Sequence, residues 1–281
     1  MPARPIAVFD SGVGGLSVVR QLRKHLPHES IVYFGDSARV PYGTKSPRTV
    51  CRFSIECARY LLRFDPKLVV AACNTASALA LDELRAALPV EVIGVVEPGA
   101  RAALQAATMS NARIAVLGTE ATIASEAYPK ALRRLAPQTP EIVPIACPLF
   151  VPIVEEGRTG ADAVARAVIA DYLAPLRTSD PHVVLLGCTH YPLLADAIRE
   201  YLGPKATIVD SGEQTALVVA ERLAQTRATA DRANRGTIQV FVSDNPPRFR
   251  AIGARFLQEE PHSVTLVAAE EYAGLDRVDC P

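Results

Sequence analysis

The sequence predicts an α/β protein built from two similar domains, each with a mainly parallel sheet flanked by helices. Short apolar, β-branched segments alternate with helical patterns along most of the chain, which is typical of parallel sheets. Residues 68–75 also resemble residues 183–190, because each segment runs from an apolar strand into a cysteine, two polar residues and a helix. We therefore expect two α/β halves related by pseudo-two-fold symmetry, with the functional site in the cleft between them.

The order of the elements follows from the same pattern. The first strand is expected at residues 6–9, followed by a glycine-rich turn and a helix over residues 16–25, where apolar residues recur at helical spacing. A second internal similarity relates Asp10-Ser11-Gly12 to Asp210-Ser211-Gly212, each just after a strand. The expected domains are residues 1–97 with 211–281, and residues 98–210. Further strands are expected at residues 31–34, 68–72, 92–96, 114–117, 183–186, 207–209 and 238–242.

Composition and charge favour a small-molecule substrate. The 281 residues are 49% hydrophobic and 21% charged, as in ordinary globular proteins. The 30 basic and 30 acidic residues give a net charge of zero, without the basic excess of a nucleic-acid-binding surface. We expect a small substrate held by local contacts, and no nucleic-acid partner.

The cysteines and the apolar segments bear on the cellular compartment. No apolar segment reaches the roughly 18 residues that a bilayer span needs, and apolar core already follows Arg4, so no membrane association or signal peptide is expected. We expect a cytoplasmic protein whose six cysteines are reduced. No two of them form a C-x-x-C pair, so no metal site is expected.

Polar residues stand at the ends of several expected strands, where open α/β sheets bind ligands. They are Asp10, Asp36, Cys73, Cys188 and Asp210. A single cysteine there is commonly a small buried hydrophobe. Two in matched settings favour chemistry, because a helix start lowers the pKa of a thiol, and Pro192 suits the first turn of the helix after Cys188.

Paired thiols without a metal serve few reactions. A disulfide is disfavoured by a reducing compartment, and a thioester-forming nucleophile needs only one cysteine with a histidine base. Inversion of a carbon centre needs an acid/base group on each face, which two facing cysteines supply. His190 is a candidate to tune Cys188, and Asp10 to tune Cys73; the alternatives are a structural hydrogen bond for His190 and a helix cap for Asp10.

The glycine-rich turn after the first strand departs from the dinucleotide-binding fingerprint. Position 17 is Ser17, so the G-x-G-x-x-G spacing is not met, and Asp10 would repel a pyrophosphate. The better use of this turn is a nest of backbone amides for a carboxylate.

Seven segments together resemble the glutamate racemase family over nearly the whole chain. The pair CNTAS and GCTHYP is the most specific, since related aspartate racemases have a histidine after CNTA and a glutamate after GCT. The segments are FDSGVGGLSV (9–18), DSARVPYG (36–43), AACNTAS (71–77), LGTEAT (117–122), CPLFVPIVEEG (147–157), LGCTHYPLL (186–194) and VDSG (209–212). The least typical region is 243–250, with Pro246-Pro247.

The resemblance implies a cofactor-independent enzyme, without pyridoxal phosphate, that interconverts L- and D-glutamate and supplies D-glutamate for peptidoglycan. Cys73 and Cys188 would be the catalytic acid/bases. Asp10, His190 and Glu155 would assist them, with Glu156 as the alternative to Glu155 and Asp36 as a secondary candidate. The substrate contacts implied are Asp10, Ser11, Tyr42, Gly43, Asn74, Thr75, Thr119, Thr122, Thr189 and His190.

Four other functions stay open beside this one. They are racemisation of a related amino acid, amino-acid binding without catalysis, a nicotinamide-dependent dehydrogenase, and a nucleic-acid-associated or interaction role in addition to catalysis, which the neutral charge does not support. A homodimer is the default expectation for assembly.

Overall fold

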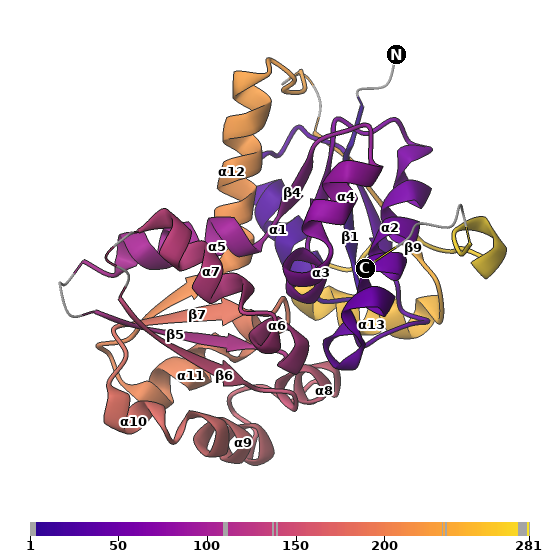
Figure 1. The fold of residues 1–281 in the computed structure, drawn as a ribbon. Coiled ribbons are helices and arrows are strands. Elements are labelled where there is room, and N and C mark those ends of the chain that lie inside the picture. The colour runs from indigo at the N-terminus through magenta and orange to yellow at the C-terminus, as the bar shows by residue number, and fades with distance from the viewer. Residues whose placement is uncertain are drawn as a thin grey trace.

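The computed structural model describes residues 4–108, 112–136, 138, 140–231, 233, 235–274 and 280. The chain forms two parallel sheets with helices on their faces (Figure 1), which confirms the predicted α/β class. The first sheet has the strand order β10-β9-β2-β1-β3-β4 and the second β6-β5-β7-β8.

The first sheet takes its strands from both ends of the chain. They are β1 (Ile6–Asp10), β2 (Ile31–Gly35), β3 (Leu68–Ala71), β4 (Val92–Gly94), β9 (Ile238–Val242) and β10 (Val264–Leu266). The helices next to them in sequence are α1 (Leu16–His25), η1 (Tyr42–Thr44), α2 (Pro47–Leu62), α3 (Asn74–Leu79), α4 (Leu81–Ala87), α12 (Ser211–Gln225), α13 (Pro246–Leu257) and η3 (Ala269–Glu271).

The second sheet comes from the middle of the chain. Its strands are β5 (Arg113–Gly118), β6 (Glu141–Ala146), β7 (Val183–Gly187) and β8 (Thr207–Asp210). The helices of this part are α5 (Val96–Ala106), α6 (Glu120–Ala124), α7 (Ala127–Leu135), α8 (Phe150–Glu155), α9 (Ala163–Leu173), α10 (Leu176–Ser179), η2 (Tyr191–Leu194) and α11 (Ala195–Leu202). All eight strands expected from sequence are present, whereas β6 and β10 were not predicted.

The two sheets repeat one strand order. This order supports the similarity between residues 68–75 and 183–190, and it corrects the similarity between residues 10–12 and 210–212. The order β2-β1-β3-β4 corresponds strand by strand to β6-β5-β7-β8. Cys73 and Cys188 therefore follow equivalent strands, β3 and β7. Asp10 and Asp210 do not, because Asp10 ends β1 and Asp210 ends β8, the counterpart of β4. Their likeness is a local turn in which each carboxylate accepts the N–H of the glycine two residues later.

Helix α12 joins the two halves. It begins directly after β8 of the second sheet and packs against α1 and α5 (Figure 1). On α1, the helical spacing places Leu16, Val19 and Leu22 on a fully buried face. Burying each such side chain stabilises the fold by about 1.5–3 kcal/mol. Helices α1 and α12 therefore share one hydrophobic core with strands of both sheets.

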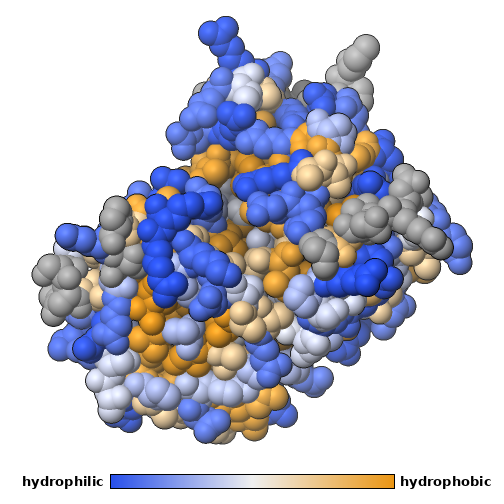
Figure 2. Space-filling model, in the orientation of Figure 1, coloured by the Kyte–Doolittle hydropathy of each residue, from blue (hydrophilic) through white to orange (hydrophobic). Residues whose placement is uncertain are grey.

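The surface mixes polar and apolar groups. Figure 2 shows charged and polar side chains spread over the displayed face, with apolar areas between them. The large exposed apolar residues come from separate parts of the chain: Leu149, Val164, Leu217 and Leu266. No helix in the described part of the chain is long and apolar enough to cross a membrane.

The expectation that all six cysteines are reduced is wrong for one pair. Cys51 of α2 and Cys280 near the C-terminus form a disulfide, with their Cα atoms 6.1 Å apart. That separation lies within the range that a disulfide bridges. The fold brings Cys280 back to α2 across 229 residues of sequence, which spacing alone does not predict.

Candidate active site

A cavity of about 310 Å³ lies between the two sheets, at the carboxyl ends of their strands. It has the volume of a small-molecule site. Both halves contribute side chains, and Cys73 and Cys188 line it together. The first half adds Ser11, Val40, Pro41, Tyr42, Gly43, Thr44, Asn74 and Thr75; the second adds Thr119, Glu120, Pro148, Val151, Pro152, Glu155, Thr189 and His190.

Cys73 is the N-cap of α3 and is held as a thiol. Its S–H points to Ser11 Oγ, 3.6 Å away. Burial raises the pKa of Cys73 to about 12, and the nearby Asp10 adds to the increase, while the backbone N–H of Ala76 opposes it. The expected lowering by a helix start is thus wrong here, because desolvation outweighs the short α3.

Cys188 has a different partner. Its sulfur lies 3.9 Å from His190 Nδ1, and His190 Nε2 lies 3.0 Å from Glu155 Oε1. Burial alone would lower the pKa of His190, but hydrogen bonds with Cys188 and Glu155 raise it to about 10. Burial likewise opposes ionisation of Glu155, yet its bond to His190 lowers the Glu155 pKa overall. An imidazolium–carboxylate pair therefore stands beside Cys188 at neutral pH.

The local structure after Cys188 also differs from the expectation. The chain enters the 3₁₀ helix η2, with Pro192 in its first turn, and the α-helix α11 starts only at Ala195. Glu156 is exposed, so Glu155 is the carboxylate that reaches His190.

Asp10 lies behind the cavity wall rather than on it. Its carboxylate is fully buried, and Oδ2 accepts the Gly12 N–H at 2.9 Å. It does not cap α1, whose N-cap is Gly15. Burial raises the pKa of Asp10, and the charge of His190 opposes that increase. Asp10 acts on Cys73 through its charge, opposite in sign to the cation beside Cys188.

Hydroxyl and amide groups form the polar floor. Asn74 donates from Nδ2 to Tyr128 OH at 2.7 Å and to Ser211 Oγ at 3.3 Å. Three threonine hydroxyls meet across the two halves: Thr75 lies 3.0 Å from Thr119 and 3.2 Å from Thr122, and the latter two are 2.9 Å apart. Thr122 does not line the cavity itself but supports the two hydroxyls that do.

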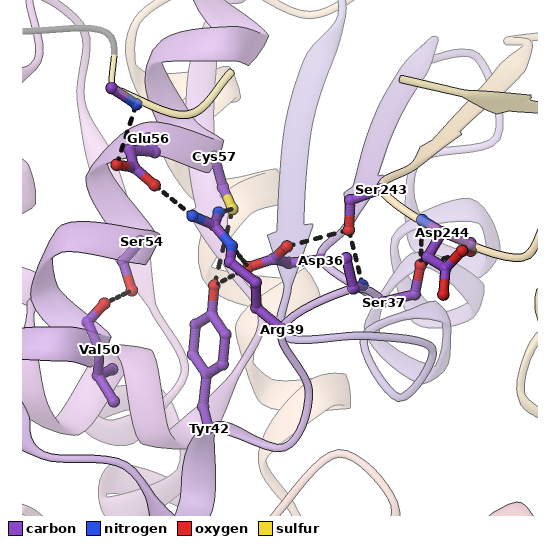
Figure 3. Close-up of polar contacts among 12 residues, drawn as sticks. Asp36, Ser37, Arg39, Tyr42, Val50, Ser54, Glu56, Cys57, Ser243 and Asp244 are labelled. Carbon is purple, nitrogen blue, oxygen red and sulfur yellow. Dashed lines mark hydrogen bonds and ion pairs between the residues drawn. The ribbon is translucent and has the colours of Figure 1, made fainter. Parts of the chain in front are cut away.

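Two aspartates expected at strand ends do not line the cavity but hold neighbouring groups in place. Asp36 is fully buried and does not line the cavity; it accepts a hydrogen bond of 2.5 Å from Tyr42 OH (Figure 3). The Tyr42 hydroxyl is thereby engaged, although the residue lines the cavity. Asp210 caps α12 by accepting the Gly212 N–H.

Some contributors were not predicted individually. Tyr128, which lies outside the seven segments, and Ser211, which lies within VDSG, both bond Asn74, and only the tertiary structure brings them there. Pro148, Val151 and Pro152 form an apolar wall. These three lie inside the CPLFVPIVEEG segment, so the motif itself was the available signal.

Gly14 marks a close approach of the two halves. A Cβ at this position would lie 2.3 Å from Thr189 Oγ1 and 2.5 Å from the His190 ring. Gly14→Ala is therefore expected to displace His190 and lower kcat/KM by about 10–100-fold. Initial rates of Gly14→Ala and of the wild type measure the change in kcat/KM, and a thermal melt checks that the variant folds. An unchanged kcat/KM would show that the close approach of Gly14 to His190 is not needed.

Nearly the whole chain resembles known proteins of one family. Residues 16–219 match the family model for Asp/Glu/Hydantoin racemases. A glutamate racemase from Geobacter metallireducens is 49% identical over 96% of this chain and 98% of its own. The crystal structure of a glutamate racemase isoform from Bacillus anthracis has a TM-score of 0.89 and 39% identity, covering 94% of this chain and 97% of that one.

A second solved structure extends the comparison to a complex. The glutamate racemase from Francisella tularensis with D-glutamate has a TM-score of 0.88 and 33% identity, covering 97% of this chain and all of that one. With near-complete coverage by such relatives, the chain belongs to the Asp/Glu/Hydantoin racemase family and, within it, to the glutamate racemases.

Proposed function

We propose that this chain interconverts L- and D-glutamate by a two-base mechanism at the α-carbon. The observation that carries the proposal is that Cys73 and Cys188 come from opposite halves and line one cavity. Each has its own auxiliary group, Asp10 or the His190–Glu155 pair. Inversion needs this arrangement, because one thiolate removes the α-proton and the opposite thiol supplies a proton to the other face.

The charges around the two sulfurs favour one resting pattern. Cys73 is a thiol with a pKa of about 12, and Cys188 stands next to an imidazolium. We infer that in the resting enzyme Cys188 removes the α-proton from the face of the substrate that it contacts. Cys73 then delivers its proton to the opposite face. After one turnover the pattern is reversed, so the opposite enantiomer or exchange with water must restore it.

The carbanion formed at the α-carbon needs stabilisation beside its carboxylate. Asn74, Thr75 and Thr189 line the cavity at the two strand ends, where the free backbone amides of a helix start favour negative charge. The remaining substrate contacts proposed are Ser11, Tyr42, Gly43, Thr119 and His190, with Thr122 and Asp10 acting from behind.

We propose the same organisation and setting that the sequence suggested. Membership of the two sheets supports domains of residues 1–97 with 211–281, and 98–210. The two-thiol chemistry needs no cofactor. We further propose a cytoplasmic enzyme that supplies D-glutamate for peptidoglycan and forms a homodimer.

Substrate identity is tested on the purified full chain, with no pyridoxal phosphate added. The circular dichroism signal of L-glutamate is expected to decay to zero, as is that of D-glutamate, while L-aspartate keeps its signal. Racemisation of aspartate at a similar rate would indicate a broader substrate range. Binding of glutamate without any decay would favour a binding protein and contradict the proposal.

A further inference from the structure

Arg39 is the centre of a buried polar network just outside the cavity (Figure 3). Its Nε donates to Asp36 Oδ2 at 2.7 Å, and its two terminal nitrogens donate to Glu56 Oε2 and to Cys57 Sγ, the latter at 3.6 Å. The centroid of the Phe53 ring lies 4.0 Å from the guanidinium carbon. Only 15% of the Arg39 side chain is exposed. One planar group thus satisfies three partners from two separate segments.

The network leads to the cavity wall through Tyr42. Asp36 Oδ2, which pairs with Arg39, also accepts the Tyr42 hydroxyl at 2.5 Å, and that hydroxyl lies 3.7 Å from Cys57 Sγ. Tyr42 begins η1, whose three residues all line the cavity. Arg39 does not line it. Any effect of Arg39 on a bound substrate must therefore pass through Val40 and Pro41, which follow it in the chain and line the cavity, or through this turn.

The turn also forms part of the contact between the two halves. A Cβ added at Gly43 would lie 2.7 Å from Thr119 Cβ, so the turn stands directly against the second half. A small displacement of η1 would change both the cavity wall and the position of the threonine hydroxyls.

The far side of the network is fixed by other segments. Asp36 Oδ1 accepts from Ser243 Oγ at 3.0 Å, just after β9. Glu56 Oε1 accepts from the Gly274 N–H at 3.2 Å, and the Tyr272 ring lies 4.8 Å from the Arg39 guanidinium carbon. Arg39 is therefore held by contacts with two aromatic rings and by acceptors along its edges, which leaves it little freedom.

We propose that Arg39 is a positioning residue that sets the Tyr42–Thr44 turn for substrate binding. The proposal rests on the proposed racemase function and deepens it, because it names what holds one wall of the substrate site. A purely structural role would instead stabilise the fold without affecting the substrate. The two roles differ in kinetics: loss of folded enzyme lowers apparent kcat at constant KM, whereas a misplaced wall raises KM.

The test is Arg39→Lys in the full chain. Lysine keeps the charge but lacks the planar fork, so it cannot reach Asp36, Glu56 and Cys57 together. We expect KM for glutamate to rise about 10-fold in both directions, with kcat changed less than about threefold. Arg52→Lys is the matched control, because Arg52 is exposed and lies near the same Phe53 ring. Its KM and kcat should equal those of the wild type.

A KM that stays constant in Arg39→Lys, with kcat falling in proportion to folded protein, would overturn the proposal. If this variant does not fold, Tyr42→Phe removes the hydroxyl that bonds Asp36 and contacts Cys57 Sγ; a smaller rise in KM is expected, and an unchanged KM would overturn the route through Tyr42. Calorimetric binding of D-glutamate separates the two proposals. A weaker Kd in Arg39→Lys supports the positioning role even if the wild type fails to racemise, and an equal Kd contradicts it.

Discussion

Cys73→Ala and Cys188→Ala are each expected to abolish racemisation of glutamate in both directions. Each thiol is the acid/base group on its own face, and the cavity lining offers no second thiol there. The loss should exceed the roughly 10²–10⁴-fold typical of a general acid or base. Initial rates by circular dichroism, starting from each enantiomer, measure it.

Proton exchange separates loss of one base from loss of the fold. In D₂O, each single variant should still exchange the α-proton of one enantiomer, and the two variants should do so with opposite enantiomers. Cys147→Ala is the matched control, because Cys147 is a buried free thiol that does not line the cavity. Near-normal racemisation by Cys73→Ala, or exchange of both enantiomers by either variant, would contradict the assignment.

His190→Asn is expected to lower kcat by about 10²–10⁴-fold, because it removes the cation beside Cys188. The wild-type kcat should fall as the pH rises through the His190 pKa of about 10. Glu155→Gln should move this decline to lower pH, since the bond to Glu155 raises the pKa of His190. Rate profiles up to about pH 10.5 check both variants.

Protonation of His190 also contributes to the stability of the fold. The pKa of His190 is raised from the ordinary 6.5 to about 10 in the folded protein, so this contribution is full below pH 6.5 and is lost as the pH rises toward 10. Melting temperatures should therefore fall more steeply across this window in the wild type than in His190→Asn.

For the rate profiles, Glu156→Gln is the control for Glu155→Gln, because Glu156 is exposed. If both glutamate variants shift the pH profile of kcat equally, the role assigned to Glu155 is wrong.

The strand-end rule predicted much of the site from sequence. It located Cys73 and Cys188, and the similarity between their segments reflects the equivalent strands β3 and β7. The sequence pattern did not predict β6, because this edge strand contains Pro144 and is only partly buried, which weakens its apolar pattern. Strands with continuous buried apolar character were all predicted.

Two features depend on tertiary structure and could not be predicted. The pKa of Cys73 follows from its desolvation and from the charge of Asp10, whereas sequence offers only the helix start. The Arg39 network combines residues near positions 36–42 with Glu56, Cys57 and Ser243. Asp36 was noticed as a strand-end aspartate, but its action through Tyr42 needed the three-dimensional arrangement.

The two-base claim is tested most directly by following the isotope at the α-carbon early in the reaction of wild-type enzyme with L-glutamate in D₂O. The proton removed stays on one sulfur, while the product receives a deuteron from the other thiol, already exchanged with solvent. The prediction is that the first D-glutamate formed carries α-deuterium while the remaining L-glutamate keeps its α-protium. Deuterium entering unreacted L-glutamate as fast as D-glutamate forms would indicate a single base and contradict the mechanism.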